Sequence, residues 1–149
     1  MSRSNHDQLL PSVADRLRSI EDAIRDIVSQ SRHCTIAIRK TDGDIGRIKW
    51  AVVSRARFVI TSACQARRMK MQSVDGRDGD ISCSDVVLMR IREARRVLDQ
   101  ARQLSRKLDQ FKLEKRDLVR RHSDLLLTAK EKIFQWKDAR STAAIDFST

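Results

Sequence analysis

The sequence predicts an all-α protein, folded as a long antiparallel coiled-coil helical hairpin. Three observations indicate this: apolar residues recur at alternating steps of three and four, only 4% of residues are aromatic, and there are four glycines and one proline. Because sheets favour aromatic residues and need frequent turns, this composition disfavours them. With 149 residues, we expect one helical domain over 1–149.

The first helix is predicted over residues 11–72. Pro11 suits the first turn of a helix, where its missing N–H costs nothing. A heptad seam follows, as is typical of a helix that packs along one stripe against another helix. The first seam residues are Leu10, Val13, Leu17, Ile20, Ile24, Ile27, Cys34 and Ile38.

The stretch TDGDIG, residues 41–46, decides between a continuous helix and a chain reversal. Asp-Gly is a hairpin signal, but a reversal has no reason to preserve heptad phase. Stepping by seven from Ile38 reaches Ile45 and further apolar residues, so the phase survives. Gly43 and Gly46 fall outside the seam, where each weakens a helix by up to about 1 kcal/mol. A continuous helix is the first interpretation, and a three-helix bundle reversing at Gly43–Gly46 is the alternative.

The turn is predicted at residues 73–84, a polar stretch with two glycines and no seam residue. The second helix is predicted over about 85–140, followed by a flexible tail at 141–149. Its apolar pattern includes Val87, Ile91, Ala94, Val97, Leu98, Ala101, Leu104, Leu108, Phe111, Leu118, Leu125, Ala129, Ile133 and Trp136.

A turn near residue 78 pairs residues whose numbers total about 156. Large apolar residues then face apolar partners. The same rule places Cys34 opposite His122, and Thr41 opposite Lys115. Such polar layers cost stability in a coiled coil but select its register.

Apolar residues outside the seam are more numerous than two helices can bury. They form a second line on each helix, which helices from other chains would cover. We therefore predict a partner interface made of Trp50, Val53, Ile60, Leu98, Val119, Leu126 and Ile133.

The net charge of +11 is unevenly distributed. Residues 1–44 sum to zero, whereas residues 45–72 contain seven basic residues and no acidic one. This predicts docking on an acidic surface, such as an acidic protein, a tubulin tail, anionic lipid or RNA, with an ordinary solvated charged face as the alternative. The residues expected to bind it are Arg55, Arg57, Arg67, Arg68, Arg92, Arg95 and Arg96.

No stretch of the sequence carries a pattern for catalysis. Glycine-rich phosphate loops are absent, and the histidines and cysteines lack the spacing of metal ligands. We therefore expect no enzyme activity, no cofactor and no metal. The three cysteines are expected to be reduced thiols.

The expected function is that of a non-enzymatic coiled-coil scaffold subunit in a multi-protein assembly, as a hetero-oligomer rather than a homodimer. The alternative is a nucleic-acid- or ribosome-associated basic helical protein. Its aromatic residues are spaced for packing and not interleaved with basic residues for base stacking. Without an apolar signal region or membrane span, we expect a cytoplasmic protein, with a nuclear or organellar matrix setting left open.

Overall fold

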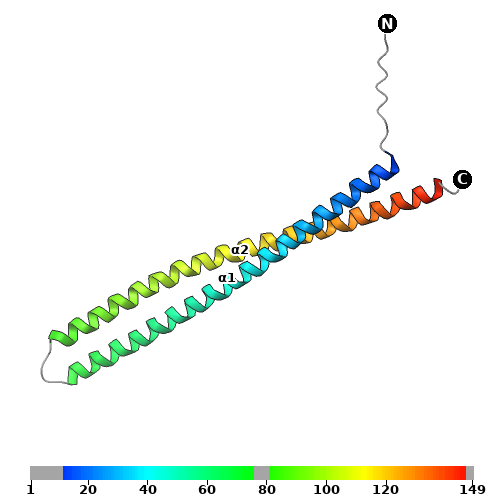
Figure 1. The fold of residues 1–149 in the computed structure, drawn as a ribbon. Helices are drawn as coiled ribbons and strands as arrows, with labels where there is room; N and C mark the ends of the chain where they lie inside the picture. The colour runs from blue at the N-terminus through cyan, green and yellow to red at the C-terminus, as the bar shows by residue number, and fades with distance from the viewer. Residues whose placement is uncertain (1–11, 76–80, 147–149) are drawn as a thin grey trace, which may run out of the picture. The chain divides into compact units, whose positions relative to one another are not determined.

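The computed structural model describes residues 12–75 and 81–146, and nearly all of them are helical (Figure 1). Helix α1 spans Val13–Asp75 and helix α2 spans Ile81–Asp146. The two long helices pack against each other as an antiparallel hairpin. The predicted all-α fold class is therefore confirmed.

The helices are longer than predicted at both the turn and the C-terminal end. Residues 73–75 and 81–84, predicted as turn, are helical, and so are residues 141–146, predicted as flexible tail. These residues lie outside the heptad pattern, but a helix already formed extends residue by residue at little cost. Hydrophobic spacing therefore marks where the helices pack and not where they end.

Ser12 caps the N-terminus of α1. Its Oγ accepts a hydrogen bond from the Asp15 backbone N–H at 3.2 Å and donates one to Asp15 Oδ2 at 2.7 Å. The Arg16 N–H donates to the Ser12 carbonyl at 3.0 Å. The Ser12 hydroxyl therefore satisfies one backbone donor of the first turn, as an N-cap serine does. Pro11, predicted in that turn, lies outside the described residues.

Helix α1 runs without a break through Gly43 and Gly46. Neither glycine has a positive φ, and a Cβ added at either would meet nothing within 4 Å. The alternative three-helix bundle, which needs a reversal at this point, is therefore wrong. The seams on both sides of the glycines hold the helix together across two residues of low helix propensity.

The chain divides into two compact units. Unit 1 comprises Met1–Ile38 and Asp117–Thr149, and unit 2 comprises Arg39–Arg116. Within each unit a segment of α1 lies beside an antiparallel segment of α2 (Figure 1). The expectation of one helical domain over residues 1–149 stays a prediction, and unfolding of the two units tests it.

The buried residues form one narrow stripe in each unit. They are Ile27 and Cys34 in unit 1, and Thr41, Ile45, Ser62, Ala66 and Ala101 in unit 2. All of them lie at positions of the predicted heptad seams, so the buried faces were predicted correctly. The outer faces of both helices stay in contact with solvent, as two helices alone can cover only one stripe each.

Polar contacts between the helices report their register. In unit 1, Trp136 Nε1–H donates to Glu21 Oε1 at 3.2 Å. In unit 2, Lys115 Nζ lies 2.6 Å from Asp42 Oδ1, next to the buried Thr41 that was predicted to face it. The residue numbers of both pairs total 157, which agrees with the predicted register.

His122 forms a polar layer in unit 1. Its Nε2 lies 3.1 Å from Ser31 Oγ and 3.5 Å from Thr35 Oγ1. Thr35 Oγ1 also donates to the Ser31 carbonyl at 3.0 Å. Cys34, which was predicted to lie opposite His122, is buried. In the sequence it lies between Ser31 and Thr35. The imidazole is thus supplied with hydrogen-bond partners inside the helix pair, as a half-buried polar group requires.

Candidate partner-helix binding surface

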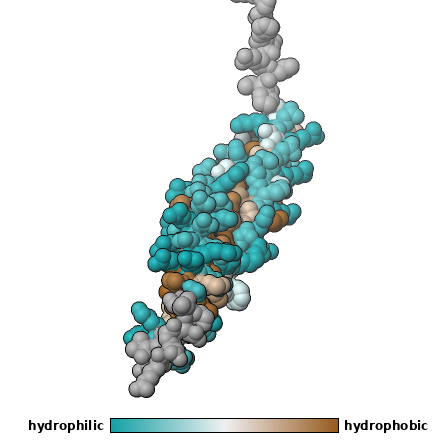
Figure 2. Space-filling model, turned by 90° about the vertical axis from the view of Figure 1, so that its left-hand side faces the viewer, coloured by the Kyte–Doolittle hydropathy of each residue, from teal (hydrophilic) through white to brown (hydrophobic). Residues whose placement is uncertain are grey.

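Large apolar side chains stand on the surface of both units. In the face that Figure 2 shows, they appear as patches among hydrophilic residues. All seven predicted interface residues are exposed, from 37% for Leu98 to 74% for Trp50. Of these residues, Trp50, Val53, Ile60 and Leu98 belong to unit 2, and Val119, Leu126 and Ile133 belong to unit 1.

In unit 2, apolar residues follow one edge of the helix pair. Val59 and Ala66 are seven residues apart on α1, and Ile91 and Leu98 are seven residues apart on α2. Residues at this spacing occupy the same side of a helix. Ala63, four residues after Val59, lies on the neighbouring strip of α1. The edge therefore presents apolar side chains from both helices.

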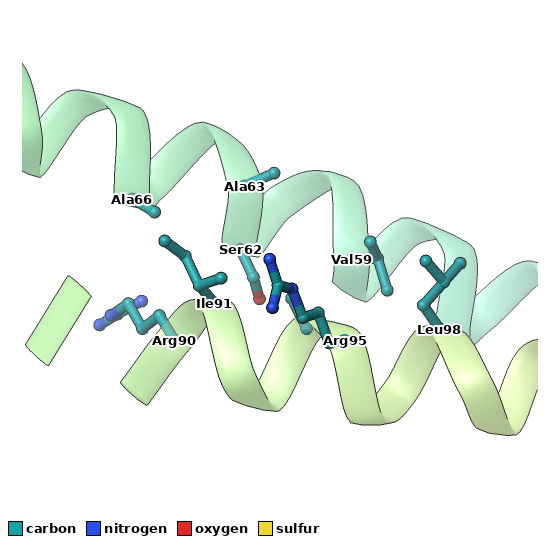
Figure 3. A pocket seen from close by; sticks show the side chains of 9 residues that line it. Val59, Ser62, Ala63, Ala66, Arg90, Ile91, Arg95 and Leu98 are labelled. Atoms are coloured by element: carbon teal, nitrogen blue, oxygen red, sulfur yellow. The ribbon is translucent and has the colours of Figure 1, made fainter. Parts of the chain in front are cut away.

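This edge contains an open hollow of about 150 Å³. Figure 3 shows its walls, which come from both helices. The lining residues are Val59, Ser62, Ala63 and Ala66 on α1, and Arg90, Ile91, Ala94, Arg95 and Leu98 on α2. The space is open because the residues that meet across it in the seam, such as Ser62 and Ala94, are too short to fill it.

Ile91 differs from its predicted role. It was expected within the seam, but its side chain is 38% exposed and lines the hollow. Arg90, one residue earlier, is less exposed and donates from its guanidinium to Gln65 Oε1 across the helix pair. Because Arg90 occupies the inner position, Ile91 is available at the edge.

The seven predicted arginines all lie in unit 2, but Arg55 is bound within the helix pair. It is half-buried and donates to Gln100 Oε1 at 3.5 Å and to the Ala51 carbonyl at 3.3 Å. The six exposed arginines are Arg57, Arg67, Arg68, Arg92, Arg95 and Arg96. None of these six forms an ion pair with any residue between 12 and 75 or 81 and 146.

Arg95 belongs to both the apolar edge and the arginine set. It lines the hollow between Ile91 and Leu98 along α2, and its side chain turns towards α1 (Figure 3). The sequence analysis assigned these residues to separate surfaces. The spacing of Ile91, Arg95 and Leu98 at steps of four and three was the signal that they share one helix face.

Unit 1 has a further apolar surface on α2 that the sequence analysis included only in part. Leu127 and Phe134 are 58% and 73% exposed, each directly after a predicted interface residue, Leu126 and Ile133. These pairs repeat at a spacing of seven residues. Leu127 and Phe134 share this spacing of seven residues, but they lie one residue after the predicted line and were not included in it.

The groups that these surfaces offer are apolar side chains and guanidinium ions, which bind by burial and by ion pairing. In the part of the chain that the structure describes, no three His, Cys, Asp or Glu side chains gather to hold a metal ion. Neither α1 nor α2, over those same residues, combines the length and hydropathy needed to cross a membrane. No protein family, curated protein or solved structure matches this chain.

Proposed function

We propose that this protein is a non-enzymatic coiled-coil scaffold subunit of a multi-protein assembly. Its helices pack against helices of other subunits, and its basic part docks on an acidic surface. The observation that supports this most directly is the set of exposed apolar side chains on helices that bury only one narrow stripe. Apolar surface left at heptad spacing is typical of helices with further helical partners.

Charge favours partners of a different kind over a second copy. Unit 2 contains twenty Lys or Arg against ten Asp or Glu, so two copies placed with these parts together repel each other. An acidic partner would gain from the same charge. The proposed assembly is therefore a hetero-oligomer, and we propose a cytoplasmic setting for it.

Trp50→Asp tests this function. The full-length tagged chain is purified from its own cells and examined by native mass spectrometry, and we expect stoichiometric helical partners to be lost with Trp50→Asp. The matched control is Gln103→Asp, which adds the same charge at an exposed position of unit 2 outside the predicted interface. Circular dichroism verifies that both variants stay helical. A chain that purifies as a stable monomer without partners would contradict the proposal.

A second candidate function is that of a nucleic-acid- or ribosome-associated basic helical protein. Six of the seven predicted arginines favour it, since they are exposed and form no ion pair with the residues that the structure describes. Binding of this kind depends steeply on salt, because arginines that neutralise phosphates release counterions. Salt-dependent RNA binding by the isolated chain, lost when Arg92, Arg95 and Arg96 are changed to Gln, would favour this candidate over the scaffold.

A further inference from the structure

The hollow in unit 2 and the cation beside it make one binding site. We propose that the edge formed by Val59 and Ala63 on α1, and by Ile91 and Leu98 on α2, binds an acidic amphipathic helix of another chain. In the bound state one large apolar side chain of that helix fills the hollow, and its carboxylates pair with arginines along the edge. This inference rests on the proposed scaffold function and adds the class of partner and the position at which it binds.

The size of the hollow selects the side chain that enters it. An apolar cavity of about 150 Å³ holds a benzene ring, so a Leu or Phe side chain fits a hollow of this volume. The walls are mostly apolar, with Leu98 and Val59 from opposite helices beside each other in Figure 3. A side chain seated here is removed from water on several sides, which stabilises the complex.

The pattern along the edge selects a helix as the partner's form. Val59 and Ala66 on α1 repeat at seven residues, as do Ile91 and Leu98 on α2. A third helix laid along a helix pair presents apolar side chains at this same interval, so successive apolar residues of that helix meet successive apolar positions of the edge.

Charge selects an acidic helix. Arg95 lines the hollow, and Arg67 lies about one helical turn after Ala63 on α1, so each helix has a cation close to the edge. Both are exposed, and neither forms an ion pair with a residue of the described ranges. Residues 45–72 contain no acidic residue. Asp or Glu flanking the partner's apolar stripe therefore meets Arg and no carboxylate on this stretch of α1.

A synthetic probe tests the proposal on the full-length chain. The probe is a fluorescent peptide of about four heptads, with Leu and Phe on one stripe and Glu on both flanks. Two control peptides carry Lys in place of every Glu, or Ser in place of every Leu and Phe. Fluorescence anisotropy at physiological salt should show that the chain binds the probe and neither of the two control peptides. If the Lys peptide binds as tightly as the probe, the partner need not be acidic and the proposal is wrong. If the Ser peptide binds as tightly as the probe, no apolar side chain enters the hollow and the proposal is also wrong.

Two matched pairs of variants locate the site. Arg95→Gln should weaken probe binding about fivefold, the upper range for a solvent-accessible ion pair. Arg39→Gln removes the same charge at an exposed position of unit 2 outside the hollow and outside the predicted arginine set, and it should leave binding unchanged. Ala63→Gln should weaken binding by placing a polar side chain in the hollow, and Thr61→Gln, two residues away and exposed, should not. If the two variants of either pair weaken probe binding equally, the proposed binding position is wrong.

Other occupants give different results. If the chain alone forms a dimer in sedimentation equilibrium and Ala63→Gln makes it a monomer, the edge binds a second copy and the proposal is wrong. If single-stranded RNA displaces the probe and binds the Arg95→Gln and Arg39→Gln variants equally, the site recognises charge alone, and the proposal is wrong. In either case the effect of Trp50→Asp on partners in cells still decides the scaffold function separately.

Discussion

Units 1 and 2 share one packing pattern but differ in charge. Unit 1 has eleven Lys or Arg against ten Asp or Glu, whereas unit 2 has twenty against ten. Both bury the heptad positions of α1 and α2, so the seam itself does not require the excess charge. Because like charges destabilise a compact state, the concentration of cations in unit 2 does not help this unit to fold, and it supports the proposed docking on an acidic surface.

The two tryptophans also differ between the units, in their exposure and in the contacts that they make. In unit 1, the Trp136 indole donates to Glu21, and the Arg140 guanidinium lies 5.1 Å from its ring centroid. In unit 2, Trp50 is 74% exposed and has no hydrogen bond to any of the residues that the structure describes. Trp136 contacts residues of its own helix pair, while Trp50 leaves an apolar area exposed that the proposed partner helices would cover.

Core truncations give the largest expected effect and test whether the two units unfold together. Ile27 in unit 1 and Ile45 in unit 2 are both 8% exposed. Ile→Ala at either should lower the free energy of unfolding by about 2–5 kcal/mol, measured by urea denaturation. If 1–149 is one domain, hydrogen exchange should show protection lost in both units. The control Ile36→Ala, at a 65% exposed position, should change stability by about 0.5 kcal/mol or less.

Protection lost only in the substituted unit would show that residues 1–149 contain two separately cooperative parts.

Glycine replacement should stabilise unit 2. Gly43 and Gly46 lie in mid-helix with open space where an added Cβ would stand, so Ala adds helix propensity without a clash. Each Gly→Ala substitution should raise the free energy of unfolding by up to about 1 kcal/mol, seen as a higher Tm in circular dichroism. A lower Tm would mean that the glycines serve a conformation other than the straight helix.

The polar layer of unit 1 should cost stability. His122→Leu replaces the imidazole near Ser31 and Thr35 with an apolar side chain in the seam. We expect the free energy of unfolding to rise by about 1 kcal/mol, because a polar seam residue selects register at the expense of stability. The matched control is His33→Leu, an exposed histidine bonded only to the Ser29 carbonyl of its own helix. A loss of stability at His122 would show that its hydrogen bonds outweigh apolar packing.

The ion pair between Asp42 and Lys115 should give the smallest effect. Both side chains are about half exposed, so a double-mutant cycle with Ala should yield a coupling of about 0.2–1 kcal/mol that falls as NaCl is raised. The pair Asp22 and Arg25, within one turn of α1 and more exposed, should couple more weakly. A coupling unchanged by salt would indicate that the pair is shielded from solvent by something other than α1 and α2.

Helix continuity and register could be predicted from the sequence because both follow from spacing. The same heptad phase on the two sides of Gly43 indicated an unbroken helix. The position of the turn determined which residues face each other, because the numbers of two facing residues then add up to a nearly constant value. The helix ends could not be predicted as well, since residues 81–84 and 141–146 have no seam residue to mark them. The Ser12 cap was missed although its signal, serine followed three residues later by an acidic residue, was present.

The sequence by itself determined which face of each helix is buried, because the period of apolar residues acts on one helix at a time. Only the tertiary structure decided where the buried stripe is incompletely filled. Ser62 and Ala94 are ordinary small seam residues separately, and a hollow arises because they meet across the helix pair. The volume left between two helices depends on pairs of side chains, so no single helix pattern contains it.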